Sequence, residues 1–192
     1  MHFVGNTMID TLVALEDRFR AAGAAAKLGL EPGAYALVTL HRPALVDGEL
    51  LPETVRQLTA LAAEMPVVFP VHPRTRSKME EVSAEHPGLL LSEPLGYVEF
   101  LSLLAEAGAV LTDSGGIQEE TTYLGVPCFT LRDNTERPVT IRAGTNTLLG
   151  LDPSAIATIP QALSAPRPAK TEPPPLWDGH ASERIAAAIA PA

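Results

Sequence analysis

One turn of this chain has residue types suited to binding an anion. It consists of Asp113-Ser114-Gly115-Gly116 and lies between a short apolar run, residues 109–112, and a helix-forming stretch. Free backbone N–H groups at the start of a helix attract anions, and glycines let an anion approach without meeting a Cβ atom. The pattern therefore predicts a site for a phosphate or a diphosphate.

Two further side chains favour a nucleotide as the ligand. Glu120 follows one turn into the helix, where its carboxylate can accept hydrogen bonds from paired hydroxyls such as those of a ribose. Arg137 lies on a loop after the next apolar run, residues 128–131, and this loop should leave the sheet at the same edge as the glycine turn. Glycine pairs also occur in ordinary strand-to-helix turns, so the glycines alone are also compatible with a turn that has no ligand.

Polar side chains also follow two other apolar runs. One run ends at His41-Arg42 and another ends at His72. The carboxyl ends of parallel strands meet at one edge of a doubly wound sheet, and ligands bind there. A histidine at a strand end often only faces water, but the arginines and the nearby glycine turn favour an anion site, with His41 as the strongest candidate.

Alternating helical and extended patterns predict an α/β fold with a Rossmann-like parallel sheet flanked by helices. Apolar runs predict buried strands, and amphipathic stretches predict the helices between them. We expect strands at residues 35–40, 67–71, 89–91, 109–112 and 128–131, and helices at residues 6–28, 50–64, 97–107 and 181–190, with another that ends near Gly125.

The same patterns divide the chain into four segments. Residues 1–28 form an N-terminal helix, and residues 29–151 form the Rossmann-like domain that carries the anion site. Residues 152–176 are rich in proline and alanine, which predicts a surface connector with at most one short helix around residues 155–163. Residues 177–192 should close the chain with a helix.

Composition narrows the classes of protein. The 192 residues, 46% of them hydrophobic, are enough for one core of ordinary size. The net charge of −9 argues against partners such as nucleic acid or an anionic membrane. A single cysteine, Cys128, excludes a disulfide framework, and no apolar stretch is long enough to span a bilayer. We therefore expect a cytoplasmic protein, and we expect neither a metal site nor a cofactor.

Six ordered motifs resemble the non-hydrolysing UDP-N-acetylglucosamine 2-epimerases. They are spread over nearly the whole chain, and the opening Gly-Asn-Thr-Met-Ile-Asp resembles the segment where that family crosses between its two domains. The motifs are Thr-Leu-His-Arg-Pro at 39–43, Val-His-Pro at 71–73, Thr-Asp-Ser-Gly-Gly-Ile-Gln-Glu-Glu at 112–120, Arg-Asp-Asn-Thr-Glu-Arg-Pro at 132–138, Ala-Gly-Thr-Asn at 143–146 and Trp-Asp-Gly-His-Ala-Ser at 177–182.

The resemblance implies a GT-B architecture, in which two Rossmann-like domains face each other across a cleft. This sequence would be the C-terminal domain, which holds most of the UDP. The N-terminal domain, which carries the catalytic carboxylates, would be supplied in cis or in trans. The family pattern places the uracil of UDP at the backbone of Phe100 and the ribose at Glu120. It places the diphosphate at Ser114, Gly115 and Gly116. Arg137 would bind UDP where it supports the closed cleft.

The resemblance also implies the reaction. The family interconverts UDP-GlcNAc and UDP-ManNAc by eliminating UDP to give a 2-acetamidoglucal and adding UDP back. His41 would be the catalytic residue near the diphosphate and the reacting sugar. Arg42 and His72 would lie toward a second sugar-nucleotide site, and a homodimer would be expected.

Two other functions remain open. The chain is alternatively a stand-alone module that binds a UDP-sugar without catalysis, or, with weaker support, part of a GT-B glycosyltransferase. Loss of the acid and base carboxylates would leave the binding module, whereas a separate or adjoining N-terminal domain would complete the epimerase.

Overall fold

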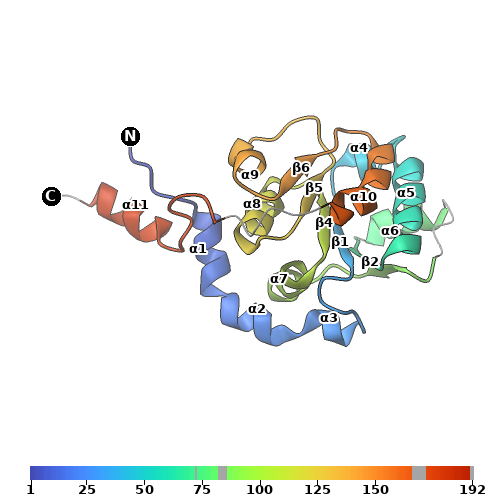
Figure 1. Ribbon diagram of the computed structural model, residues 1–192, viewed down its shortest axis with the longest axis horizontal. Coiled ribbons are helices and arrows are strands. Elements are labelled where there is room, and N and C mark those ends of the chain that lie inside the picture. The colour runs from blue at the N-terminus through green and yellow to red at the C-terminus, as the bar shows by residue number, and fades with distance from the viewer. Residues whose placement is uncertain (72, 82–85, 166–171, 191–192) are drawn as a thin grey trace.

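The computed structural model describes residues 1–71, 73–81, 86–165 and 172–190. Within them, one parallel sheet of six strands has the order β3-β2-β1-β4-β5-β6 (Figure 1). The strands are β1 (Ala36–Thr39), β2 (Val67–Pro70), β3 (Leu89–Ser92), β4 (Ala109–Thr112), β5 (Cys128–Thr130) and β6 (Asn146–Leu148). This strand order is that of a doubly wound nucleotide-binding fold, so the predicted Rossmann-like architecture is confirmed.

The order of the strands reverses between β1 and β4, the two central neighbours. Their register pairs Thr39 with Thr112, so both strands end at the same level. In open α/β sheets, ligands bind at the carboxyl edge where the strand order reverses. The turns that follow Thr39 and Thr112 therefore lie where the fold itself favours a site.

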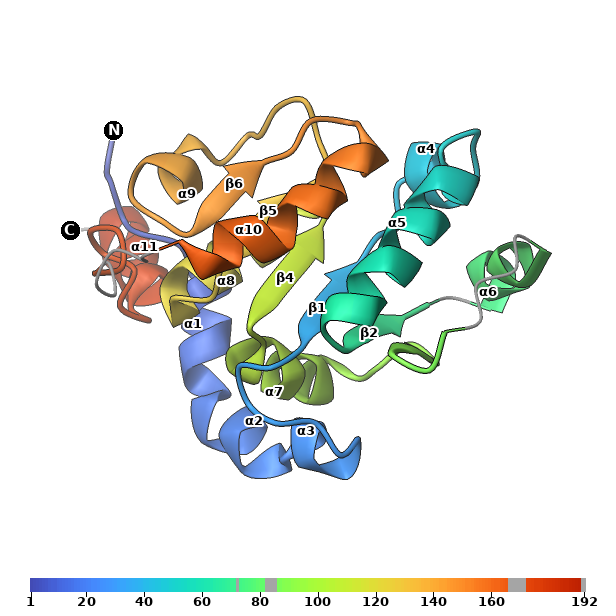
Figure 2. The ribbon, with the colours of Figure 1, turned by 45° about the vertical axis from the view of Figure 1, so that its right-hand side comes forward.

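Alternate residues of the strands pack on opposite faces of the sheet. Val38 and Leu111 pack on one face, and Leu37 and Val110 pack on the other. The first face is covered by α4 (Pro43–Val46), α5 (Leu51–Glu64), α6 (Pro73–Glu81), a 3-10 helix η1 (Pro153–Thr158) and α10 (Ile159–Ser164). The second face is covered by α3 (Ala24–Lys27), α7 (Tyr97–Glu106) and α8 (Gly115–Leu124), so the domain has three layers (Figure 2).

The single helix expected over residues 6–28 is wrong. The chain forms α1 (Thr7–Ala14), α2 (Glu16–Ala22) and α3, with breaks at Leu15 and Gly23. Leu15 leaves the helical region (φ −104°, ψ 3°), and Gly23 adopts a left-handed conformation (φ 58°), which glycine tolerates without a Cβ penalty. The breaks let α1 contact α8, whereas α2 and α3 pack against α7 (Figure 1).

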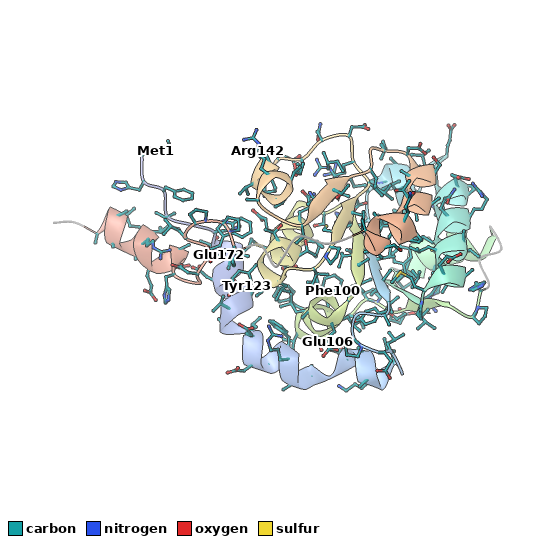
Figure 3. All side chains as sticks on the ribbon, viewed as in Figure 1. Met1, Phe100, Glu106, Tyr123, Arg142 and Glu172 are labelled. Carbon is teal, nitrogen blue, oxygen red and sulfur yellow. The ribbon has the colours of Figure 1, made fainter. Side chains whose placement is uncertain are left out.

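A small apolar cluster fixes these helices to the Rossmann-like body. Leu12 and Phe19 pack against Leu101 of α7, and Tyr123 of α8, labelled in Figure 3, packs against the same cluster. Asn6 caps α1 by accepting a hydrogen bond from the Met8 N–H (2.9 Å).

The two ends of the described chain lie together (Figure 2). The Asp10 carboxylate accepts hydrogen bonds from the N–H groups of Ala181 (3.0 Å) and Ser182 (2.6 Å), at the start of α11 (Ala181–Ile189). Arg184 of α11 donates to the Val4 carbonyl (3.3 Å) and pairs with Asp178. The predicted closing helix is thus present, and it is anchored to α1.

The start of the segment expected to be a surface connector is instead part of the core. Pro153, Ile156 and Ile159 are buried, and η1 packs against α5. The expected short helix around residues 155–163 corresponds to η1 and α10, which follow one another directly. Apolar residues at 153, 156 and 159 have helical spacing, and this spacing outweighs the proline content of the segment.

Four short elements were missed by the sequence analysis. They are β6, α4, α6 and α9 (Pro138–Arg142). All three of the missed helices begin at a proline, where the fixed φ angle suits the first helical turn. Cys128 is buried and unpaired, as expected, and burial raises the pKa of its thiol to about 11. None of the described helices has the length and apolar character needed to cross a membrane.

Candidate functional site

The glycine turn forms the start of α8 at the carboxyl edge of the sheet. Ser114 occupies the N-cap position with an extended backbone, but its side chain makes no capping hydrogen bond. Its own N–H donates to Thr112 Oγ1 (3.0 Å). An uncapped helix start carries partial positive charge on its free N–H groups, which favours an anionic ligand.

Gly115 and Gly116 leave open space above this helix start. Neither has a positive φ angle. A Cβ atom added to Gly115 would meet no described atom within 4 Å, and one on Gly116 would meet only Met8 Cε, at 3.4 Å. The fold itself therefore does not require glycine at these positions, which favours the ligand-binding interpretation over that of a simple turn.

A buried carboxylate joins this turn to the one after β1. The Asp113 side chain is fully buried, and its Oδ2 accepts hydrogen bonds from the N–H groups of His41 (2.9 Å) and Arg42 (2.8 Å). Its Oδ1 lies 2.7 Å from Nδ1 of His41, whose side chain is 65% exposed. The Arg42 Nε donates to the Asp113 carbonyl (3.2 Å). The structure thus brings His41, Arg42 and the glycine turn together, as the sequence predicted.

Glu120 is buried one turn into α8. Its exposure is 2%, and its Oε1 accepts a hydrogen bond from the Tyr97 hydroxyl (2.7 Å). Its Oε2 has no partner among the described residues. Burial raises the pKa of Glu120, the Tyr97 hydrogen bond lowers it, and the nearby Glu119 charge raises it further. A buried acceptor without a partner lowers stability, so this oxygen marks a position that a ligand hydroxyl can satisfy.

Glu119 holds Arg137 beside α8. The Arg137 Nε lies 2.9 Å from Glu119 Oε1, and the same oxygen accepts a hydrogen bond from Asn6 Nδ2 (2.9 Å). These contacts place the Arg137 guanidinium, with a side chain 41% exposed, at a hollow of about 470 Å³. The hollow is also lined by Met8, which approaches Gly116. Arg137 therefore lies on the glycine-turn side of α8.

A buried network of polar side chains shapes the loop that carries Arg137. The Asn146 amide donates to Gln118 Oε1 (3.0 Å) and Thr140 Oγ1 (3.1 Å), and Asn146 Oδ1 accepts from Thr130 Oγ1 (2.6 Å). Gln118 Oε1 also accepts from Thr135 Oγ1 (2.6 Å). The network links α8, β5, β6, α9 and the loop, and through Thr135, which accepts from the Arg137 N–H (3.0 Å), it helps to fix the position of Arg137.

A second ion pair stiffens the same loop. Arg132 is 7% exposed and donates to both carboxylate oxygens of Glu136, with NH1 to Oε2 at 2.9 Å and NH2 to Oε1 at 2.6 Å. This bidentate pairing lowers the pKa of Glu136 to about 2. A hollow of about 350 Å³ lies between this loop and the turn that carries Arg42.

Two predicted site residues remain, Phe100 and His72. Phe100 is half-buried in α7 (Figure 3). Its N–H donates to the Gly96 carbonyl (2.9 Å), so the helix already uses that N–H. His72 lies outside the described residues. Within the described part of the chain, no cluster of three or more His, Cys, Asp or Glu side chains is placed to hold a metal ion.

Sequence reasoning named neither Asp113 nor Tyr97 as a site residue. Asp113 directly follows a buried strand and is the first residue of the glycine turn. This place was the signal for Asp113, but no role of its own was predicted for it. Tyr97 carried no signal of its own, because its contact with Glu120 joins two helices that only the fold brings together. The fold is typical of nucleotide-binding α/β domains, and the open start of α8 is suited to an anion.

The particular family follows from comparison with known proteins. A family model described as UDP-N-acetylglucosamine 2-epimerase matches residues 1–190, so the chain belongs to that family. A UDP-N-acetylglucosamine 2-epimerase of Methanococcus maripaludis is 39% identical over 168 residues, which cover 81% of this chain and 46% of that protein. A UDP-2,3-diacetamido-2,3-dideoxy-D-glucuronate 2-epimerase of Pseudomonas aeruginosa is 37% identical over 150 residues, 77% of this chain and 41% of that protein.

A solved structure supports the same assignment. The Methanocaldococcus jannaschii UDP-GlcNAc 2-epimerase in complex with UDP-GlcNAc and UDP has a TM-score of 0.74 and 34% identity, over 97% of this chain and 54% of that one. The chain therefore spans about half the length of the relatives it matches, which agrees with its interpretation as the C-terminal domain of a GT-B fold.

Proposed function

We propose that this chain is the UDP-binding half of an enzyme that interconverts UDP-GlcNAc and UDP-ManNAc. The observation that carries the proposal is the combination, on one helix, of an open glycine start and the buried Glu120 with an unpartnered Oε2. Glu120 follows Gly116 by four residues, which is about 6 Å of helix rise. This spacing suits a nucleotide whose diphosphate lies at the helix start and whose ribose hydroxyls reach the carboxylate.

The proposed placement of UDP follows from the charges. The N–H groups of Gly115 and Gly116 and the hydroxyl of Ser114 face the diphosphate, because the Ser114 N–H is already engaged by Thr112 Oγ1. The Arg137 guanidinium adds to the positive potential of the helix start, and the His41 ring adds a donor. Uracil then lies toward the start of α7, where Tyr97 and Phe100 are found. Because the Phe100 N–H is engaged with Gly96, we expect its carbonyl or ring, rather than its N–H, to meet the base.

The proposed chemistry is an elimination followed by an addition. A base removes the proton at C2 of the sugar, the bond from C1 to the diphosphate oxygen breaks, and its electron pair leaves with UDP. Re-addition of UDP and protonation of the other face at C2 give the epimer. This half of the protein stabilises the departing diphosphate. Stabilisation of the leaving group accounts for a large share of the lowering of the barrier in such reactions. The acid and base carboxylates would come from an N-terminal domain.

Further parts of the proposal concern partners. The relatives named above act on two different UDP-sugars, and UDP-GlcNAc is supported by the Methanococcus relative and by the ligand of the solved structure. We place Arg42 toward a second sugar-nucleotide site, because it borders the hollow of about 350 Å³ on the far side of the Asp113 turn. A homodimer is expected from the family resemblance, and the buried, unpaired Cys128 supports a reducing, cytoplasmic setting.

Calorimetric titration with UDP tests this proposal directly. We expect saturable binding that is weakened by at least tenfold in Glu120→Ala and in His41→Ala. Glu53→Ala, which removes an exposed carboxylate from α5, is the control and should bind like the wild type. Absence of UDP binding in the wild type would contradict the proposal.

Turnover distinguishes the epimerase from a binding module. An NMR assay with UDP-GlcNAc should show no UDP-ManNAc with this chain alone, and epimer formation once the N-terminal domain is supplied. Binding of UDP with no turnover in the joined protein would favour the stand-alone binding module.

A further inference from the structure

Tyr97 makes the one hydrogen bond that the described part of the chain offers to the buried carboxylate of Glu120. The tyrosine hydroxyl donates to Glu120 Oε1 at 2.7 Å, and Oε2 has no partner among the described residues. We propose that Tyr97 is a positioning residue that holds Glu120 as an acceptor for the ribose hydroxyls and so makes the site selective for ribonucleotides. This role rests on the proposed function, in which Glu120 meets the ribose.

The fold brings the two residues together from neighbouring helices. Tyr97 is the first residue of α7, which follows β3, and Glu120 lies near the start of α8, which follows β4. The strands are parallel, so both helices begin at the carboxyl edge of the sheet, where the glycine turn also lies. Tyr97 therefore lies at the edge of the sheet where the nucleotide is proposed to bind.

The space beside Tyr97 is open. The preceding residue, Gly96, has an ordinary φ angle of −64°, and a Cβ atom there would meet no described atom within 4 Å. Tyr97 is 39% exposed, whereas Glu120 is 2% exposed. The tyrosine is thus the outer member of the pair and the carboxylate is the inner one, so a ligand has room next to the residue that holds the carboxylate.

The same hydrogen bond favours the form of Glu120 that accepts. Burial raises the pKa of Glu120, the Tyr97 hydrogen bond lowers it, and the Glu119 charge raises it further. Burial and the hydrogen bond to Glu120 raise the pKa of Tyr97, so its hydroxyl keeps the proton and remains a donor. An ionised carboxylate only accepts, whereas a protonated carboxyl group carries a donor on one of its oxygens. Loss of the tyrosine hydroxyl should therefore make Glu120 a poorer acceptor.

Tyr97→Phe removes the hydroxyl and keeps the ring, and the ligand can be changed at the matching position. UDP carries both ribose hydroxyls, whereas 2′,3′-dideoxy-UDP carries neither and has the same base and diphosphate. In calorimetric titrations near neutral pH, we expect Tyr97→Phe to bind UDP about threefold to tenfold more weakly than the wild type does. The affinity for dideoxy-UDP should be the same in both proteins, which also shows that the site of the variant is intact.

Tyr123→Phe is the matched control. It removes a hydroxyl from α8, beside the cluster of Leu12 and Phe19, and should bind both nucleotides like the wild type. Equal losses for UDP and dideoxy-UDP in Tyr97→Phe would mean that the tyrosine only fastens α7 to α8. No loss for either nucleotide would mean that Glu120 does not need it. Either result overturns the role of Tyr97.

A measurement on the free protein separates this role from the proposed function. Carbon NMR follows the ionisation of the Glu120 carboxyl group, and the Glu120→Gln spectrum identifies its signal. We expect a higher pKa of Glu120 in Tyr97→Phe than in the wild type, because burial and the Glu119 charge then act without the opposing hydrogen bond. Absence of UDP binding in the wild type would contradict the proposed function. The pKa would still decide the role of Tyr97, because an unchanged value overturns it.

Discussion

Two glycines next to α8, Gly115 and Gly144, differ in what surrounds them. A Cβ atom on Gly144, after α9, would lie 2.4 Å from Thr122 Oγ1 and 2.5 Å from the Thr140 carbonyl oxygen. A Cβ atom on Gly115, at the start of α8, would meet no described atom within 4 Å. Packing within the chain thus explains the first glycine, whereas no described atom of the chain explains the second.

The polar side chains beside these turns differ in the same way. Asn146, next to the Gly144 turn, has hydrogen-bond partners at both ends of its amide. Glu120, in the helix that follows Gly115, has one paired oxygen and one without a described partner. Asn146 therefore serves stability, whereas the open oxygen of Glu120 is an acceptor that a ligand can satisfy. Unpaired buried atoms alone do not mark a ligand site, because Gln118 Nε2, Thr122 Oγ1 and Thr145 Oγ1 near the Gly144 turn also have no described partner.

Gly144→Ala should have the largest effect on stability. The added methyl group meets a backbone carbonyl and a buried threonine, neither of which can move freely, so we expect a loss of about 3 kcal/mol in the free energy of unfolding. Urea denaturation measures the change. An alanine tolerated within about 0.5 kcal/mol would contradict the distinction between the two turns.

Gly115→Ala should have the converse effect. The methyl group enters open space, so the free energy of unfolding should change by less than about 1 kcal/mol. The same methyl occupies the space proposed for the diphosphate. Loss of one charge-assisted hydrogen bond, about 1.5–3 kcal/mol, corresponds to UDP binding weaker by roughly tenfold to 100-fold in a titration. Unchanged UDP affinity would place the diphosphate elsewhere.

Glu119→Gln should have a smaller effect on UDP binding. The change removes the charge that holds Arg137 but keeps an oxygen for Asn6. Because Arg137 is partly exposed, the lost attraction is worth about 0.5–1 kcal/mol, or twofold to fivefold in the dissociation constant. Glu183→Gln on the exposed side of α11 is a matched control. A loss of more than tenfold would mean that Glu119 itself contacts the ligand.

Glu120→Gln should change how stability depends on pH. The pKa of Glu120 is raised in the folded state, so its ionisation opposes folding once the pH exceeds the ordinary value of 4.5. The amide avoids this penalty and can still accept from Tyr97. We therefore expect a small gain in the free energy of unfolding at pH 7, which disappears as the pH falls below 4.5. Denaturation at several pH values would show a constant difference if burial of the charge were unimportant.

Local sequence patterns predicted β1 to β5 and the glycine turn, because each depends on residues that are close in the chain. The His41–Asp113 contact joins residues 72 positions apart, and Tyr97 meets Glu120 across 23 positions. No periodicity reports such pairs. The breaks at Leu15 and Gly23 were missed for a related reason: apolar spacing predicts a helix but does not show that the helix must bend around α7 and α8.

The Asp10 cap on α11 has a consequence for synthesis on the ribosome. Its carboxylate and its first partner, the N–H of Ala181, are 171 residues apart in sequence. At translation rates of 5–20 residues per second, Asp10 emerges roughly 10 to 30 s before the helix start that it will cap. During that interval the nascent sheet can form and α1 can pack against α8, while the Asp10 carboxylate still lacks its partners on α11. We therefore expect the contact between α1 and α11 to form last in folding, after the glycine turn at the start of α8 has formed.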